Sequence, residues 1–530
     1  MDVTADFMPP TIEWFALSPY IALLAGALVL LLVGSLTPRW PRGWYAIVAA
    51  TTAGVAAVLA GLQFAALETE AARTLVKGTI AHDRFGLLAI IAVCFTVVMS
   101  AMTTSDAASH DSLDTRSKSA SRDSLEPYAL MLTAALGAAV MVSANDLLAV
   151  FLGIEILSLS LYVLAASDRR RTASQEAGLK YFILGGFASA FLLYGIALVY
   201  GKTGQTNFGG ISTVLAAEVS LPRNDTMLLA GVALLLVGFG FKVSLVPFHS
   251  WTPDVYQGAP THVTGLMASL GKVAAVVAFV RLFVVAFPSS ADDWRPAMFV
   301  LAILTLVVGS VLAIVQTDVK RMLAYSSISH AGFMLVGLEA AGHIGSSSAA
   351  EGVSSTITYV VLYSVLALGS FAAVSAVAAA SGAASSGGTT PGAVSAGTAS
   401  QLTSLDAFRG VAKRQPVFAL GFTVLLLAQA GVPLTSGFVA KFGVIRAAVS
   451  TESYVLAIVA MVSAVIAAYL YLRIMVSMWL AEPDSAASSP AVLTLPTRVV
   501  LVASVVITLV LGILPSFVLD LGDSLTALAR

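Results

Sequence analysis

The sequence predicts an all-α polytopic membrane protein with about fourteen transmembrane helices. Of its 530 residues, 58% are hydrophobic and only 11% are charged, and the mean hydropathy is +0.91. Apolar runs of roughly 20 residues alternate with short polar segments, and about 20 helical residues cross a hydrocarbon core of about 30 Å. Residues 1–530 are therefore expected to form a single transmembrane domain.

The apolar runs define fourteen expected spans. They lie near residues 17–36, 44–66, 84–103, 126–142, 145–166, 176–200, 226–248, 261–287, 295–316, 319–341, 353–380, 416–447, 452–480 and 496–517. The start of the chain contains Asp2, Asp6 and Glu13 but no early Lys or Arg, which does not fit a cleaved signal peptide. The first span is thus expected to be retained.

An even number of spans places both termini on one side of the membrane. The loops on the opposite side hold more Lys and Arg residues, including Arg169–Arg171, Lys320 and Arg321. Because basic loops stay in the cytoplasm, both termini are predicted on the outer face of a bacterial plasma membrane.

Two polar stretches fall on the predicted cytoplasmic side. Residues 104–125 are rich in Ser, Asp and Ala, and residues 381–402 are rich in Gly, Ser, Ala and Thr. Neither has enough apolar residues to build a core, so both are predicted to be flexible loops.

Two spans are predicted to be broken helices. As one helix, residues 416–447 would be about 48 Å long, and Gly431, Pro433 and Gly437 interrupt the run. The span from residue 226 is similarly interrupted at Pro247. Backbone groups freed at membrane depth must be satisfied by protein or by a wet cavity, so each break predicts a small polar cavity.

The broken helices are the seventh and twelfth spans, which suggests two five-helix repeats. Spans 4–8 (residues 126–287) would form the first repeat and spans 9–13 (residues 295–480) the second. An odd number of spans inverts the second unit relative to the first, as in many transporters.

Five ionisable residues lie inside apolar spans: Glu155, Lys180, Lys242, Lys272 and Lys441. A charge at the bilayer centre costs roughly 2.5–3.5 kcal/mol on insertion scales, so such groups usually mark a polar pathway. Lys242 is five residues before Pro247, and Lys441 is eight residues after Pro433. The same pathway is predicted to include His330, which lies in a locally polar span.

Each of these residues also has a structural interpretation. Glu155 suits a neutral, hydrogen-bonded acid, and Lys180 and Lys441 can extend their stems to the interface. His330 suits an interhelical hydrogen bond as well as a proton shuttle. Arg281 and Arg473 are expected to pack, and the single cysteine, Cys94, is expected to be inert.

Several functional classes are excluded. The net charge of −1 provides no basic surface for nucleic acid. The sequence has no metal-ligand cluster, phosphate-binding glycine loop or haem-attachment motif. No metal, redox centre or other cofactor is therefore expected on this chain.

The chain carries five recognisable motifs. Residues 242–261, KVSLVPFHSWTPDVYQGAPT, look like the signature of the antiporter-like subunits of respiratory complex I, and WTPDVYQGAP is similar to the version in one branch of this family. Matches of the same kind are FLGIEILSLSLYVL (151–164), LKYFILGGFASA (179–190), QTDVKRMLAYSSISHAGF (316–333) and GVPLTSGFVAKF (431–442).

The resemblance implies a fourteen-helix, proton-translocating subunit of NADH:quinone oxidoreductase. By similarity, Glu155 is the acid of the fifth helix, Lys242 its partner on the broken seventh helix and Lys272 the central lysine of the eighth. Lys441 matches the lysine of the broken twelfth helix, and Lys180 and His330 match further polar positions. NADH, FMN, Fe-S clusters and quinone are expected on partner subunits, beside other antiporter-like and small membrane subunits.

We therefore expect proton transfer along buried Lys, Glu and His side chains linked by water. Alternatives are a subunit of a multisubunit cation/proton antiporter or membrane-bound hydrogenase, and a stand-alone ion-coupled solute transporter. Co-purifying partners distinguish the first alternative, and activity of the isolated chain in vesicles distinguishes the second. A purely structural scaffold would tolerate replacement of the buried lysines by methionine.

Overall fold

The predicted all-helical membrane architecture is confirmed. The computed structural model describes residues 12–37, 40–41, 43–67, 72–111, 124–217, 226–345, 347–385, 402–482 and 493–529. Within these residues, twelve helices are long and apolar enough to cross a membrane. The helix at 319–341 and the broken helix at 416–450 complete the fourteen predicted spans.

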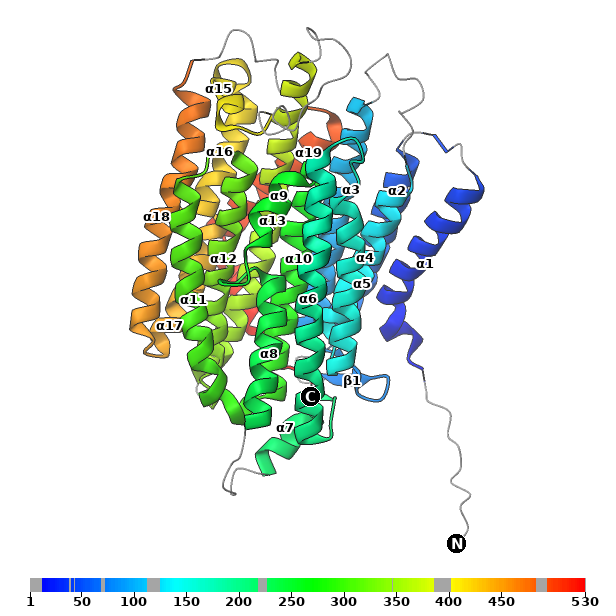
Figure 1. Cartoon of the computed structure of the whole chain (residues 1–530), viewed down its shortest axis with the longest axis vertical. Helices are drawn as coiled ribbons and strands as arrows, with labels where there is room; N and C mark the ends of the chain where they lie inside the picture. Colours follow the sequence, from blue (N-terminus) through cyan, green and yellow to red (C-terminus); the bar gives the residue numbers. More distant parts are fainter. Residues whose placement is uncertain are drawn as a thin grey trace.

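Three helices and a small hairpin precede the first repeat. They are α1 (Trp14–Leu36), α2 (Trp44–Ala66), β1 (Arg73–Leu75), β2 (Ile80–His82) and α3 (Arg84–Asp111). The antiparallel strands pair Arg73 with His82 and Leu75 with Ile80. The hairpin lies at the lower end of the bundle (Figure 1), where Glu13 forms an ion pair of 2.7 Å with Arg73.

The first repeat is followed directly by the second. The first contains α4 (Glu126–Ser143), α5 (Leu147–Ala165), α6 (Thr172–Thr203), α8 (Thr226–Val243), α9 (Trp251–Gly258) and α10 (Thr261–Arg281), and α7 (Phe208–Ala217) lies between α6 and α8. A π-helical turn, η2 (Leu282–Ala286), and a 3₁₀ turn, η3 (Pro288–Ser290), lead into the second repeat.

The second repeat has the same order of long helices. It contains α11 (Ala291–Ile314), α12 (Val319–Ala341), α13 (Ser347–Ser385), α16 (Pro416–Ala430), α17 (Ser436–Ser450) and α18 (Tyr454–Trp479). The 3₁₀ turn η4 (Leu405–Phe408) and α15 (Val411–Arg414) precede α16, and α19 (Leu495–Ile513) and α20 (Pro515–Asp523) follow α18.

Matching helix pairs show the repeat. In the first unit α5 packs on α4, α6 packs on α8 and α9, and α10 returns to α4. In the second unit α12 packs on α11, α13 packs on α16 and α17, and α18 returns to α11. The start of α5 is bonded to the lower hairpin through Asn145 and Thr79, whereas the start of α12 is bonded to Thr403 and Leu405, which precede α15 at the upper end. The two units are therefore inverted.

Both helix breaks are present, and one differs in detail from the prediction. The seventh span was expected to run to residue 248, but α8 ends at Val243 and a second short helix, α9, begins at Trp251. Pro247 lies inside the connecting segment. The twelfth span is interrupted between Ala430 and Ser436, with Pro433 in the gap.

Helix extends into both predicted loops. The helix α3 continues to Asp111 and α13 to Ser385, so the expectation of loop from residues 104 and 381 was wrong at these ends. Alanine is the best helix former, and both stretches begin with Ala-containing segments. Residues 112–123 and 386–401 lie outside the described residues.

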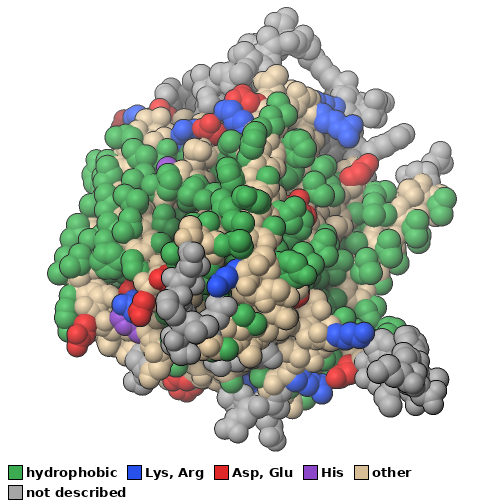
Figure 2. Space-filling model, turned by 60° about the horizontal axis from the view of Figure 1, so that its bottom comes forward, with side chains coloured by type: hydrophobic (Ala, Val, Ile, Leu, Met, Phe, Trp, Pro, Cys, Tyr) green, Lys and Arg blue, Asp and Glu red, His purple; other side chains and the backbone are tan. Residues whose placement is uncertain are grey.

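The outer surface suits a bilayer. Figure 2 shows hydrophobic side chains over a broad part of the visible face, with most Lys and Arg side chains toward its margins. Large apolar side chains such as Phe187 on α6 and Val465 on α18 point outward, whereas α10 and α13 are almost wholly buried. The central helices can therefore hold polar groups away from lipid.

Candidate functional site

The first helix break surrounds Lys242 with polar groups. The Lys242 ammonium is buried and donates to Ser158 Oγ at 2.7 Å and to the Tyr181 hydroxyl at 3.3 Å. The carbonyl of Phe241, near the end of α8, accepts a bond of 3.1 Å from the Ser244 backbone and one of 3.0 Å from the Trp251 indole. A cavity of about 10 Å³, enough for one water, lies beside Lys242. The predicted polar cavity is present at this break.

Glu155 lies next to this cavity. Its carboxylate accepts a hydrogen bond from Ser189 on α6, and Ser189, Ser158 and Lys242 all line the cavity. Ser158 is three residues after Glu155 and therefore on the same face of α5. Hydroxyl groups thus lie between the acid and the lysine that sequence predicts to be partners.

Lys272 lies between the two repeats. Its side chain is 2% exposed, and its ammonium donates to the carbonyls of Ser327 on α12 and, at 3.4 Å, of Val243 at the end of α8. The ammonium also lies 5.7 Å from the centre of the Tyr363 ring. Because Val243 follows Lys242 in the chain, the break in α8 brings the two lysines to one region.

His330 follows Ser327 by one turn of α12. Its Nδ1 lies 2.7 Å from the Tyr359 hydroxyl and its Nε2 lies 3.2 Å from the Tyr471 hydroxyl. The Tyr363 ring, which faces Lys272, also contacts the imidazole, with 4.8 Å between ring centres. His330 is therefore part of a polar cluster that continues from Lys272.

The second break holds Lys441. Gly431 ends α16 with a φ of +90°, a conformation that favours glycine. The Lys441 ammonium donates to the carbonyls of Gln429 at 2.8 Å and Ala430 at 2.9 Å. These are the last carbonyls of α16, which lack intrahelical partners and carry the negative end of the helix dipole. The site therefore stabilises a charged lysine in a buried position.

The structure does not bring Lys180 into this series. Its side chain is 42% exposed and pairs with Glu176 at 2.7 Å and Asp254 at 3.0 Å. Asp254 also accepts from Arg321 of the second repeat at 2.7 Å. Lys180 is thus in an ion-pair network that joins the two repeats near the surface.

Sequence reasoning missed several polar side chains of the site. Lys320 was counted among the loop cations, but it is 1% exposed and donates to the Ala259 carbonyl at 2.5 Å. Ser158, Ser189, Tyr471 and Gln429 were also missed. Hydroxyl and amide groups are common in membrane helices, so only their spacing from the ionisable residues could have pointed to them.

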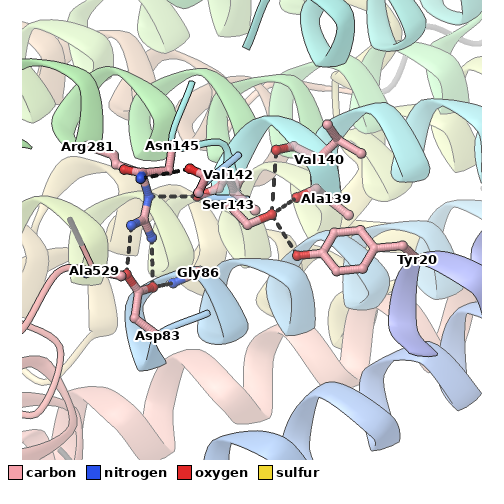
Figure 3. A network of polar contacts seen from close by, with 11 residues as sticks. Tyr20, Asp83, Gly86, Ala139, Val140, Val142, Ser143, Asn145, Arg281 and Ala529 are labelled. Carbon is pink, nitrogen blue, oxygen red and sulfur yellow. Dashed lines mark hydrogen bonds and ion pairs between the residues drawn. The ribbon is translucent and has the colours of Figure 1, made fainter. Parts of the chain in front are cut away.

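A buried ion pair outside this series of lysines lies at the lower end of the bundle. Arg281 donates to both carboxylate oxygens of Asp83, at 2.6 and 2.7 Å, and both side chains are fully buried (Figure 3). Asp83 also accepts from the backbone of Gly86 and Ala529. Burial opposes ionisation, but Arg281 and these hydrogen bonds outweigh it and lower the pKa of Asp83. The burial and pairing of Arg281 agree with the packing role expected from the sequence.

Three comparisons relate the chain to known proteins. Residues 144–467 match the family described as NADH:quinone oxidoreductase/Mrp antiporter, TM. NADH-quinone oxidoreductase subunit N of Mycobacterium tuberculosis is 39% identical over 98% of this chain and 99% of its own length. The protein of the same name from Rhodococcus opacus is 45% identical over 76% of this chain and 70% of its own length.

Solved structures support the same family relationship. A chain of respiratory complex I from Thermus thermophilus with bound aureothin is 29% identical, covers 95% of this chain and 99% of its own length, and superposes with a TM-score of 0.74. A chain of the Mrp complex from Dietzia shares the fold, with a TM-score of 0.79, 21% identity and coverage of 97% and 96%. With matches over nearly its whole length, the chain belongs to the NADH-quinone oxidoreductase subunit N family of antiporter-like membrane proteins.

Proposed function

We propose that this chain translocates protons as a membrane subunit of an NADH:quinone oxidoreductase. The observation that carries the proposal is a series of buried titratable side chains, Lys242, Lys272, His330 and Lys441, that crosses both repeats and is joined by hydroxyl groups and helix-end carbonyls. Ionisable groups this deep in a membrane protein are costly and usually functional.

The proposed path begins at Glu155 and Lys242. Attraction between the carboxylate and the ammonium favours a proton on Lys242, and a change in their separation alters that preference. The proton then passes to Lys272, on toward His330, and ends at Lys441. Water in the cavity beside Lys242 would supply the contact between Glu155 and Lys242. Lys180 is left outside this path because it is ion-paired at the surface.

The redox chemistry belongs to partners in this proposal. In the described residues, no cluster of three or more His, Cys, Asp or Glu side chains is arranged to hold a metal ion. We place NADH, FMN, Fe-S clusters and quinone on other subunits, whose conformational signal drives the proton path. Other antiporter-like and small membrane subunits would flank this chain.

The orientation follows from the basic loops. The first and last described residues lie near the same hairpin, since Glu13 pairs with Arg73 and Ala529 donates to Asp83. We place this end on the outer face of the plasma membrane, because the opposite loops carry the cluster Arg169–Arg171.

The test uses the intact complex in proteoliposomes. Lys242→Ala and Glu155→Gln are expected to slow NADH-driven acidification or alkalinisation of the lumen about 100-fold, at the lower edge of what positioned acid–base groups contribute. Lys413→Ala, at an exposed cytoplasmic-side position, is the control and should pump normally. Normal pumping by both Lys242→Ala and Glu155→Gln would refute the proposal.

A further inference from the structure

We propose that Tyr471 and Ser326 form a hydroxyl relay that carries a proton from His330 toward Lys441. This inference rests on the proposed translocation and adds two residues to its path. Tyr471 comes from α18 and Ser326 from α12, and both are at least 98% buried. Neither is titratable near neutral pH by itself, so their contribution depends on geometry.

Contacts run from His330 through Tyr471 and Ser326 as far as Gln429. The Tyr471 hydroxyl lies 3.2 Å from His330 Nε2 and 2.6 Å from Ser326 Oγ. Ser326 in turn donates to Gln429 Oε1 at 3.4 Å, and the backbone carbonyl of Gln429 holds Lys441 at 2.8 Å. The Tyr471 hydroxyl therefore contacts the His330 imidazole on one side and Ser326 on the other, and Ser326 leads to Gln429, which holds Lys441.

Gln429 sets the direction of every bond in the relay. Its Nε2 donates to Ser370 Oγ at 2.5 Å, which turns Oε1 toward Ser326. A carbonyl oxygen only accepts, so the Ser326 hydrogen is committed to it. Ser326 Oγ then accepts from the Tyr471 hydroxyl, and the Tyr471 oxygen accepts from His330 Nε2–H. In the neutral imidazole Nδ1 is left as the acceptor for Tyr359.

This order permits a balanced transfer. The Lys272 ammonium loses a proton, which reaches Nδ1 of His330 as the Tyr359 hydroxyl turns from donor to acceptor. The Nε2–H bond then breaks and a new O–H bond forms on Tyr471. The original Tyr471 proton moves to Ser326, and the original Ser326 proton leaves for the amine of Lys441. The imidazole ends neutral, each hydroxyl regains one hydrogen, and the new ammonium is held by the carbonyls of Gln429 and Ala430.

Gln429 acts as a positioning residue. Its amide does not exchange protons readily, so the last transfer requires the neutral Lys441 amine to approach Ser326. Lys441 is held at the end of a flexible four-carbon stem, and Gly431 leaves space beside that stem because it has no Cβ. Movement of Lys441 between Ser326 and the α16 carbonyls would therefore control the final step.

The experiment compares hydroxyl deletions in the intact complex in proteoliposomes. Tyr471→Phe and Ser326→Ala should each slow NADH-driven proton translocation by about tenfold, or about 1.4 kcal/mol, comparable to one hydrogen bond to a charged group. The ratio of rates in H₂O and D₂O should rise, because proton transfer becomes limiting. Ser329→Ala is the matched control: this buried hydroxyl on α12 has no hydrogen-bond partner in the described part of the chain.

Two further variants separate the possible outcomes. Tyr359→Phe removes a hydroxyl from the same imidazole but none from the onward path, so it should retain severalfold more activity than Tyr471→Phe. Equal loss from both, or native pumping and isotope ratio in Tyr471→Phe and Ser326→Ala, would overturn the relay. If Lys441→Ala is impaired while Tyr471→Phe is native, the relay alone fails. If Lys441→Ala and Lys242→Ala also pump normally, the proposed function fails with it.

Discussion

Thr206 Oγ1 donates a hydrogen bond of 2.6 Å to Asp146 Oδ2, and the same contact recurs in the second repeat, where Thr403 donates to Asp318 at 2.5 Å. Both aspartates are N-caps, of α5 and α12 respectively. These are the helices that carry Glu155 and His330. In both units a threonine thus bonds the N-cap aspartate of the helix that carries the titratable group, and the two contacts lie at opposite ends of the bundle.

Replacing either cap should destabilise the protein to a similar extent. Asp146→Ala and Asp318→Ala each remove a side-chain acceptor from the first turn of a helix and strand a threonine hydroxyl. We expect each to lower the free energy of unfolding by about 1–2 kcal/mol. Thermal unfolding followed by tryptophan fluorescence measures this. Thr206→Val and Thr403→Val are the controls, with smaller losses. A large loss in one repeat and none in the other would contradict the equivalence of the two caps.

Gly431→Ala should disturb Lys441 without removing it. A Cβ at this position would lie 2.9 Å from Lys441 Cδ, and the backbone has a φ of +90° that alanine adopts only with strain. We expect about 1–2 kcal/mol of destabilisation together with slower proton translocation. Gly345→Ala tests strain alone, since its φ is +91° and its Cβ would meet no atom within 4 Å. Equal translocation in both variants would show that the contact with Lys441 is unimportant.

The Asp83–Arg281 pair should contribute stability throughout the neutral range. Asp83→Ala leaves a buried guanidinium without its counter-charge, which costs about 3–5 kcal/mol. The folded-state pKa of Asp83 is below its ordinary value, so this contribution is complete above about pH 4 and is lost as the pH falls through the folded pKa. The difference in unfolding midpoint between native and variant protein should be constant from pH 5 to 8 and shrink in acid.

A double variant provides the control for this pair. Asp83→Leu combined with Arg281→Met removes both charges, and apolar replacements of buried ion pairs are often near neutral in stability. We expect it to be more stable than Asp83→Ala alone. A double variant that is less stable than the single one would indicate that the other contacts of Arg281, with the Val142 carbonyl and the Phe85 ring, contribute more than the unpaired charge costs.

The sequence was enough to predict the spans, the two breaks and the burial of Lys242, Lys272, His330 and Lys441. Long apolar runs and proline positions report directly on membrane crossing and helix interruption. Lys320 was assigned the wrong environment, and the ion pairs of Lys180 were not predicted, for a shared reason. Both contact α9 or the residue that follows it, since Lys180 pairs with Asp254 and Lys320 donates to the Ala259 carbonyl, and such a contact with a separate helix cannot be read from the local sequence. The partners of His330 come from α13 and α18, so no local pattern predicts them.

The network around Asp254 allows the role of Lys180 to be tested against that of Arg321. Lys180→Gln removes partly exposed ion pairs, which contribute about 0–1 kcal/mol, so we expect little change in unfolding midpoint or in proton translocation. Arg321→Gln removes bonds to Asp254, Gln257 and Gln316 and so weakens the attachment of α9 to α12. Because α12 carries Ser327 and His330, this variant should be both less stable and slower. Arg321→Lys keeps the charge but not the several bonds, and should be intermediate. If Lys180→Gln instead abolishes translocation while the midpoint is unchanged, Lys180 belongs to the proton path and its ion pairs mark where protons reach the buried series.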